Sequence, residues 1–335
     1  SQANAQLKLS APEAGLEISY QDYQRGVFSS QLKMVVKPLT GAENSWLKPG
    51  QRVILDESVS HGPIPLASLK SFNLAPAMAS VNTVLVNNDV TKPLPFDINT
   101  RISYNGDTES TIALKPLDYE KDAEKVTFSG GDFVLSADRQ GSLVSLTGEA
   151  KSGQVNAVNE YDQKVQFTFN NLKTDGSSKL TSFEERIGDQ TLSLERLAVS
   201  VEGKDLAELT GMTIAGKSSL TPDGKKINSQ LDYTLNNLKL QNQDFGSGQL
   251  TLKVDGIDGV AMHQFSQQYQ AQTQALMAQP DLAQNPELYQ QKAVDALFNT
   301  LPILLKGDPV VTLSPLSWKN AKGESSLNLS LALKD

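Results

Sequence analysis

Apolar and polar residues alternate most regularly in residues 192–201, which read LSLERLAVSV. The same alternation returns in residues 231–235 (LDYTL) and 248–254 (GQLTLKV). Successive side chains of a β-strand point to opposite faces of a sheet, so this period of two predicts strands. Leucine fills most of the apolar positions. We therefore predict an antiparallel sheet in this region, with one apolar face and one face exposed to water.

Shorter segments with the same pattern flank this region and are separated by turn residues. Gly26, Asn105-Gly106 and Gly130-Gly131 are predicted turns, because glycine reaches positive φ at little cost. The segment from His61 to Pro65 is predicted to be a loop or an edge, since proline cannot donate to a ladder. The further predicted strands are residues 6–10, 16–20, 30–36, 51–55, 81–86, 96–104, 110–114, 124–129, 131–137, 143–149, 165–169, 310–313 and 325–333.

One short segment of the β-rich region occurs twice. Residues 167–173 read FTFNNLK, and residues 233–239 read YTLNNLK, so the two differ only at their first and third positions. The match is too short to distinguish a duplicated subdomain from coincidence in a chain rich in strands.

The pattern changes to a helical one between Ile257 and Gly307. Large residues follow spacings of three, four and seven, with glutamines on the other face. A second helix starts at Asn285-Pro286, with Asn285 as the N-cap and Pro286 at the first helical position. The large residues of this hairpin either pack on the sheet as core or form a dimer interface or a lid over a cleft. They are Met262, Phe265, Tyr269, Leu276, Leu297 and Phe298.

These patterns assign the chain to the mainly β class, as elongated antiparallel sheets with an amphipathic helical hairpin near 258–306. We divide it into an N-terminal antiparallel β region (1–125), a β-meander or repeat-like region (126–257), the hairpin (258–306) and returning strands (307–335). Residue 1 is Ser rather than Met, and Asp335 directly follows a predicted strand. We therefore expect the protein to have further residues at both ends.

Composition excludes several classes of function. The chain of 335 residues contains 39% hydrophobic and 20% charged residues, which is typical of a folded protein. It has no cysteine, which excludes disulfides and thiolate metal sites, and its only histidines are His61 and His263. A net charge of -8 argues against binding nucleic acid or an anionic membrane surface. No apolar run is long enough to span a bilayer.

The motif search yields no catalytic set. Residues 211–218 (GMTIAGKS) match the P-loop pattern, but Pro222 and Asp223-Gly224 predict a turn where a phosphate-binding helix would have to start. We interpret the two glycines as strand ends. His61 is interpreted as a structural loop residue and His263 as a helix-flank residue, and no Gly-x-Ser-x-Gly elbow is present. We predict no catalytic residue, no cofactor, no metal site and no enzymatic activity.

A family resemblance begins at residues 20–30 (YQDYQRGVFSS). Tyr23, Arg25-Gly26 and Phe28 resemble the Tyr-x-Arg-Gly-hydrophobic-Phe-Ser-Ser signature of the YdgA/YihF-type bacterial proteins, a family of unknown function. His61-Gly62-Pro63 and residues 307–320 are similar to segments of the same family. The motif also has a structural interpretation, in which Arg25-Gly26 turns the chain and Tyr20, Tyr23 and Phe28 stack around the corner.

The resemblance implies a single-pass protein of the bacterial inner membrane with a large periplasmic part. The anchor would then precede Ser1, homodimerisation is expected, and no catalytic residue is carried over. Our first hypothesis is a non-enzymatic periplasmic scaffold that homodimerises or binds an envelope protein. The alternative is a periplasmic groove that binds or transfers a lipid or acyl chain, with the leucine face of the sheet as its lining. An enzymatic role would need carboxylates that converge across strands.

Overall fold

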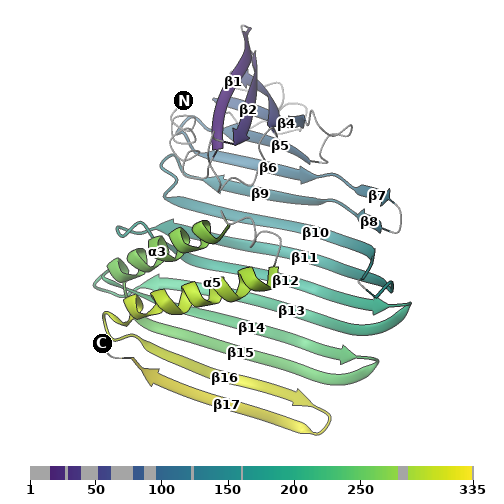
Figure 1. The fold of residues 1–335 in the computed structure, drawn as a ribbon. Coiled ribbons are helices and arrows are strands. Elements are labelled where there is room, and N and C mark those ends of the chain that lie inside the picture. The colour runs from purple at the N-terminus through teal and green to yellow at the C-terminus, as the bar shows by residue number, and fades with distance from the viewer. Residues whose placement is uncertain are drawn as a thin grey trace. The chain divides into compact units, whose positions relative to one another are not determined.

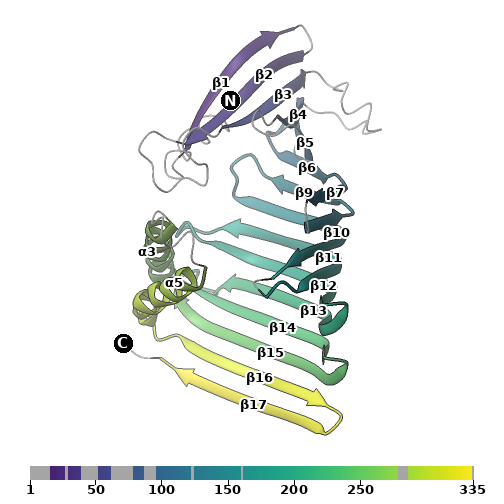
Figure 2. The same cartoon turned by 45° about the vertical axis from the view of Figure 1, so that its right-hand side comes forward.

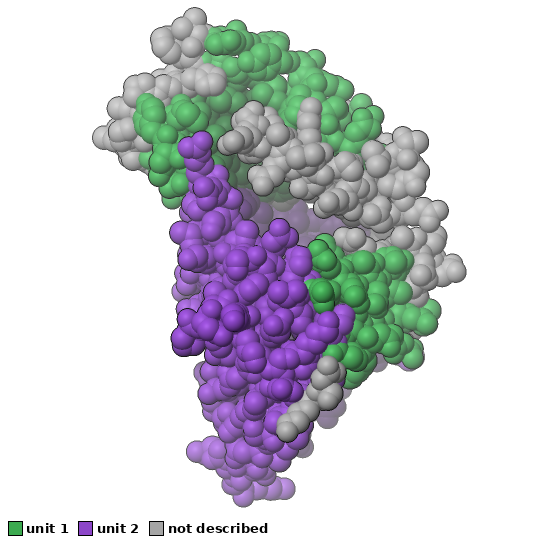
Figure 3. All heavy atoms as spheres, turned by 90° about the vertical axis from the view of Figure 1, so that its left-hand side faces the viewer, with its two compact units in different colours: residues 1–110, 264–302 green, residues 111–263, 303–335 purple. Residues whose placement is uncertain are grey.

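The computed structural model describes residues 16–26, 29–38, 52–61, 78–86, 96–121, 124–159, 161–277 and 286–333. Its strands form an antiparallel sheet of 17 strands, interrupted by a helical insertion (Figures 1 and 2). The predicted mainly β class is therefore confirmed. The chain divides into two compact units, residues 1–110 with 264–302 and residues 111–263 with 303–335 (Figure 3). Our division into four regions stays a prediction.

The first unit begins with a meander in which each strand pairs antiparallel with the next. The buried apolar residues of this meander include Val35, Val36, Ile54 and Ala79. Its strands are β1 (Leu16–Arg25), β2 (Ser29–Pro38), β3 (Val53–His61), β4 (Ala79–Val86) and β5 (Phe96–Ile102), followed by β6 (Thr108–Leu114) across the boundary between the units. The predicted strand at 6–10 lies outside the described residues.

Two predicted turns of this unit are confirmed. At the first, the amide of Gly26 donates to the Ser29 carbonyl at 2.7 Å, and β1 pairs back on β2. At the second, the amide of Ser103 donates to the Asp107 carbonyl at 2.8 Å, and Gly106 between them has a φ of 94°. Side chains disfavour the backbone of Gly106, whereas at Gly26 a Cβ would lie only 3.1 Å from the Ser29 carbonyl oxygen.

The prediction of a turn at Gly130-Gly131 is wrong. The strands β8 (Glu124–Phe128) and β9 (Gly131–Ala137) both pair antiparallel with β10 (Leu143–Val158), so the chain continues past Gly130 without reversing. Glycine is needed there for another reason: a Cβ on Gly130 would lie 2.7 Å from the Leu114 carbonyl oxygen. The strand β7 (Leu117–Lys121) was not predicted, because three of its five residues are charged and a charged segment is typical of a solvated loop.

The central part of the second unit is a meander of strands of 15 to 17 residues. These are β11 (Lys164–Leu180), β12 (Arg186–Val201), β13 (Lys204–Leu220), β14 (Lys226–Leu240) and β15 (Gln243–Asp258). Tight turns join them. At one of these, the Asp223 carboxylate accepts hydrogen bonds from Thr221 Oγ1 at 2.6 Å and from the Lys225 amide at 3.2 Å. These bonds lower the pKa of Asp223, because they stabilise its charged form.

The P-loop match lies entirely inside β13. Gly211 and Gly216 are interior residues of that strand, so our interpretation of them as strand ends is wrong. The turn predicted around Asp223-Gly224 is confirmed by the hydrogen bond from the Thr221 amide to the Lys226 carbonyl at 2.9 Å. The glycine-rich segment therefore continues as a strand and ends in a turn, which is not the strand-loop-helix context of a phosphate site.

The predicted helical hairpin is confirmed as α3 (Gly259–Met277) and α5 (Pro286–Thr300), followed by the short 3-10 helix η1 (Leu301–Leu305). Asp258 caps α3, because its Oδ1 accepts the Ala261 amide at 2.9 Å. Pro286 opens α5 as predicted, whereas Asn285 lies outside the described residues. None of the helices in the described ranges combines the length and the apolar character needed to cross a bilayer. The chain returns to the sheet as β16 (Val310–Asn320) and β17 (Gly323–Ala332).

Aromatic rings of neighbouring strands cover glycines inside the sheet. Phe133 of β9 lies over its pairing partner Gly148 of β10, and Trp318 of β16 lies over Gly248 of β15. A Cβ on Gly248 would be 2.6 Å from Trp318 Cζ3. The ring therefore occupies the space that a side chain would take, which restores packing at a residue that lacks one.

Candidate binding site

The strand register of the second unit brings leucine-rich positions into rows across the sheet. Leu192 pairs with Ile214, Ile214 with Tyr233, and Tyr233 with Leu250. The row continues through Leu316 to Leu327 on β17. Directly paired residues point to the same side of a sheet, so these side chains form one continuous surface.

A second row runs parallel to the first on the same side. Leu231 pairs with Leu252, Leu252 with Leu313, and Leu313 with Leu329. We call the surface made by both rows, together with Leu331, the apolar face. It is incompletely covered: Leu316 is 42% exposed, and Leu327, Leu329 and Leu331 are 52%, 45% and 48% exposed. Contiguous exposed apolar surface of this kind is characteristic of interaction sites.

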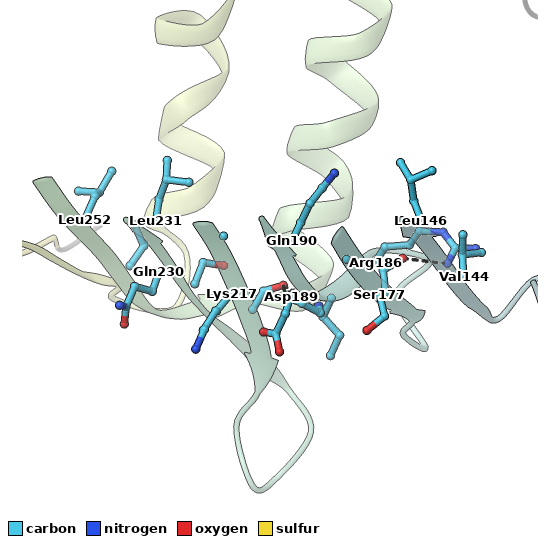
Figure 4. A pocket seen from close by; sticks show the side chains of 18 residues that line it. Val144, Leu146, Ser177, Arg186, Asp189, Gln190, Lys217, Gln230, Leu231 and Leu252 are labelled. Carbon is cyan, nitrogen blue, oxygen red and sulfur yellow. Dashed lines mark hydrogen bonds between the residues drawn. The ribbon is translucent and has the colours of Figure 1, made fainter. Parts of the chain in front are cut away.

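The opposite side of the same strands is polar. Gln230 Nε2 and Thr251 Oγ1 both donate to the Asp232 carboxylate at 2.7 Å. In Figure 4 the side chains of Gln230 and Lys217 point away from the side on which Leu231 and Leu252 lie. The prediction that leucines would occupy one face and polar residues the other is therefore confirmed for these strands.

An open hollow of about 600 Å³ lies on the same side of the sheet as the apolar face and crosses β10 to β15 (Figure 4). We call this hollow the furrow. Leucine and valine side chains form its two flanks, and small residues of β11, β12, β13 and β14 form its floor. Gln190 of β12 is the exception, because its side chain points to the same side as the leucines. The flanks are Val144 and Leu146 at one end and Leu231, Leu252 and Val254 at the other. The floor includes Gly176, Ser178, Gly188, Gly216, Ser218 and Ser229.

Two of the three floor glycines are fixed by backbone contacts. A Cβ on Gly176 would lie 2.8 Å from the Asp189 carbonyl oxygen, and one on Gly188 would overlap the Ser177 carbonyl oxygen. Gly216 differs, because the nearest atom to its Cβ would be Leu231 Cδ1 at 3.9 Å. The absence of side chains at the first two residues thus follows from strand packing, whereas Gly216 leaves room that a larger residue could fill.

Arg186 provides the cationic group of the furrow. It opens β12, and its guanidinium donates to the carbonyl of Ser142 and the hydroxyl of Ser178, each at 3.4 Å, and to the carbonyl of Gly141. These acceptors are neutral, and no ion pair of Arg186 occurs among the described residues. Sequence reasoning missed this residue, because only the strand register brings it beside Val144 and Leu146.

The residues of the family motif lie in the first unit. Tyr20 is partly buried on β1, and burial together with the nearby charge of Glu57 raises its pKa. Burial also raises the pKa of Glu57 itself. Tyr23 is 63% exposed, and Arg25 and Gly26 form the corner. The stacking around that corner stays a prediction, because Phe28 lies outside the described residues, as do Gly62, Pro63 and the side chain of His61.

The large residues of the helical hairpin do not share one environment. The rings of Phe265 and Tyr269 stack at a centroid distance of 5.9 Å, whereas Phe298 is 65% exposed. Met262, Leu276 and Leu297 are partly buried. Whether these residues form an interface or a lid stays a prediction.

His263, which we interpreted as a helix-flank residue, contacts two carboxylates. Its Nδ1 lies 3.2 Å from Glu185 Oε1, and its Nε2 lies 3.6 Å from Glu184 Oε2. Both glutamates belong to the turn before β12, and Phe183 of that turn covers Gly259. These contacts attach the first turn of α3 to the sheet of the second unit. No cluster of three or more acidic or histidine side chains suited to a metal ion occurs in the described part of the chain.

Comparison with known proteins identifies relatives over the whole chain. Residues 1–335 match the family described as bacterial protein of unknown function, DUF945. Protein YdgA of Escherichia coli K12 is 67% identical over 342 residues, which covers 100% of this chain and 68% of that protein. The uncharacterized protein YihF of the same organism is 31% identical over 330 residues, covering 96% of this chain and 67% of that protein. No solved structure matches the chain.

Proposed function

The chain belongs to the DUF945 family of bacterial proteins of unknown function. We propose that it is a non-enzymatic envelope protein whose apolar face binds the acyl chain of a lipid. The observation that carries this proposal is the furrow, which has apolar flanks and a floor of small residues interrupted by Gln190. A flat leucine surface would offer a chain contact on one side only. The furrow offers contact on three sides, which is how pockets remove apolar ligands from water.

The dimensions of the furrow suit an extended chain. It crosses the sheet from β10 to β15, and six strands spaced by about 4.8 Å span about 24 Å. Burying a methylene contributes about 0.8 kcal/mol, so ten of them contribute about 8 kcal/mol before the cost of association is subtracted. Because that cost is of similar size, we expect long chains to bind and short chains to bind little.

The proposal includes a location on the periplasmic side of the inner membrane. It rests on the family resemblance of the motif at Tyr23 to Ser30, and an upstream segment would act as the tether. Protease protection of the full-length protein in spheroplasts and in inverted vesicles tests the location. Digestion in spheroplasts is expected, and digestion only in inverted vesicles would overturn it.

Native mass spectrometry of the purified chain, with and without added palmitate, tests acyl binding. We expect an adduct that Gly216→Val abolishes, because a valine on the furrow floor fills the space beneath the chain. The matched control is Ala215→Val, which adds bulk to the same strand on the opposite face. Loss of the adduct in both variants, or no adduct in the parent chain under either condition, would contradict the proposal.

Self-association is a second candidate, favoured by the exposed leucines of β17. A second copy that packs on Leu327, Leu329 and Leu331 would remove them from water. Light scattering of the variant with all three changed to Thr is expected to show a monomer where the parent is a dimer. The control changes Ser326, Asn328 and Ser330 to Thr on the other side of the same strand. A parent that stays monomeric at high concentration would rule this candidate out.

A further inference from the structure

We infer that the furrow selects a single-chain amphiphile with an anionic headgroup, which Arg186 binds at the β10 end. This inference rests on the proposed acyl binding and adds the chemistry of the headgroup. It starts from the asymmetry of the furrow lining, in which leucine and valine alone flank the β15 end and a guanidinium joins them at the β10 end (Figure 4).

The register of the sheet fixes the side of Arg186. Arg186 lies two residues before Gly188 on β12, and alternate residues of a strand share a face. Its Nη1 donates to Ser178 Oγ, and Ser178 belongs to the furrow floor. The guanidinium therefore lies on the apolar face beside Val144 and Leu146 rather than on the polar side of the sheet.

The hydrogen bonds of Arg186 leave part of its donor capacity unused. A guanidinium has five N–H groups. Nη1 donates to Ser142 and Ser178, and Nη2 donates to Gly141, so among the described residues Nε–H and one Nη2–H have no acceptor. Nε–H and an Nη2–H are the donors with which an arginine binds the two oxygens of a carboxylate side-on, so the unused donors suit an anionic headgroup.

The charge of Arg186 is also not neutralised by its surroundings. Its acceptors are two carbonyls and a hydroxyl, and Asp138 of the same turn instead accepts the Leu143 amide at 3.0 Å. A fixed cation at one end of an apolar furrow favours an anion attached to an apolar chain. The furrow crosses the strands from β10 to β15 with Arg186 at its β10 end, so we commit to a long-chain fatty acid as the occupant.

Isothermal titration calorimetry with palmitate and with hexadecanol, the uncharged alcohol of the same chain length, tests this inference. We expect palmitate to bind about tenfold more tightly, as a charge-assisted bidentate contact at a partly solvated site predicts. Arg186→Gln should remove the preference by weakening palmitate binding more than hexadecanol binding, and Arg186→Lys should restore part of it. Lys179→Gln is the control, since it removes a cation from the neighbouring strand on the opposite face.

The outcomes distinguish the headgroup assignment from the proposed acyl binding on which it rests. Equal binding of acid and alcohol by the parent chain would overturn the headgroup assignment and leave acyl binding standing. The headgroup assignment would also be overturned if the Arg186→Gln variant still prefers palmitate while its circular dichroism spectrum matches that of the parent. Binding of neither compound would overturn acyl binding and the headgroup assignment together. The comparison of acid with alcohol in the parent chain stays decisive even if the Arg186 variants fail to fold.

Discussion

Glycines of this protein have two distinct roles, and substitution by alanine distinguishes them. A Cβ on Gly148 would overlap the ring of Phe133, whereas one on Gly216 would meet nothing closer than 3.9 Å. We expect Gly148→Ala to destabilise the fold by about 1–3 kcal/mol through overpacking. Gly216→Ala should instead stabilise it by about 0.4–1 kcal/mol, because alanine reduces the freedom of the unfolded chain.

Urea denaturation of both variants measures these changes. The variant that combines Gly148→Ala with Phe133→Leu serves as the control, because removing the ring should recover much of the lost stability. If Gly148→Ala unfolds at the same urea concentration as the parent, the ring does not pack on the glycine as described.

Glu57 makes the stability of the first unit depend on pH. Burial raises its pKa above the ordinary value of 4.5, so its charged form is disfavoured in the folded state. The resulting destabilisation is fully present above the folded pKa and disappears as the pH falls below 4.5. Glu57→Gln is therefore expected to raise the melting temperature at pH 7, with a gain that shrinks on acidification. A gain that grows as the pH falls would contradict the assignment.

The structural role of a single residue was predictable from the sequence where the local backbone conformation favours that residue type. Gly26 and Pro286 occupy the turn and the helix start that their conformational preferences indicated. Arg186 was not predictable, because its role depends on Ser178 and Leu146 of two other strands. The residues next to Arg186 in the sequence do not indicate which residues of the other strands lie beside it.

At the scale of elements, the cap of α3 controls how the helix begins. Asp258 Oδ1 accepts the Ala261 amide, and losing such a cap costs about 1 kcal/mol. Asp258→Ala should therefore speed amide hydrogen exchange in the first turn of α3, whereas Asp258→Ser should retain most of the protection. Hydrogen exchange with mass spectrometry measures both. Equal exchange in the two variants would show that the contacts of His263 and Gly259 hold the turn without the cap.

The repeated segment acquires a structural meaning from the pairing of the strands. Asn170 pairs with Arg196, Arg196 with Thr210, and Thr210 with Asn237, so both Asn-Asn pairs lie at the same level of the sheet. Asn171 there has a φ of 50°, and the β14 register shifts between Leu235 and Leu238. Asparagine tolerates such backbone better than most residues. The sequence showed the repetition, but only the pairing shows that it marks one irregular level of the sheet.

Period-two alternation found most strands and underestimated their lengths. The predicted strand at 165–169 extends over 164–180, because pairing with β10 and β12 continues beyond the alternating residues. β13 was missed as a strand, because its two glycines were interpreted as strand ends although both lie in its interior. Alternation indicates that one side of a segment is buried. The length of a strand is set instead by its pairing with neighbouring strands, and a local sequence pattern contains no information about those partners.

At the scale of the whole molecule, the mainly β fold class was predictable from the sequence, whereas the apolar face was predictable only in part. Alternating leucines predicted an apolar face, and the register of β12 to β17 joins the leucines into continuous rows. The furrow was not predictable, because it results from glycines and serines of four strands that meet at two neighbouring levels of the sheet. Such a site depends on contacts between residues distant in sequence.

The apolar face also links the two candidate functions. The row that flanks the furrow at Leu231 and Leu252 continues through Leu313 to Leu329, one of the exposed leucines of β17. If a fatty acid and a second copy compete for this surface, each must weaken the binding of the other by the same factor.

We expect palmitate to shift a dimer toward monomer, and higher protein concentration to weaken apparent palmitate affinity. Analytical ultracentrifugation with and without palmitate measures the first shift. The Gly216→Val variant provides the control, since a filled furrow should leave the dimer insensitive to palmitate. A dimer that persists unchanged in the parent at saturating palmitate would show that association uses a different surface.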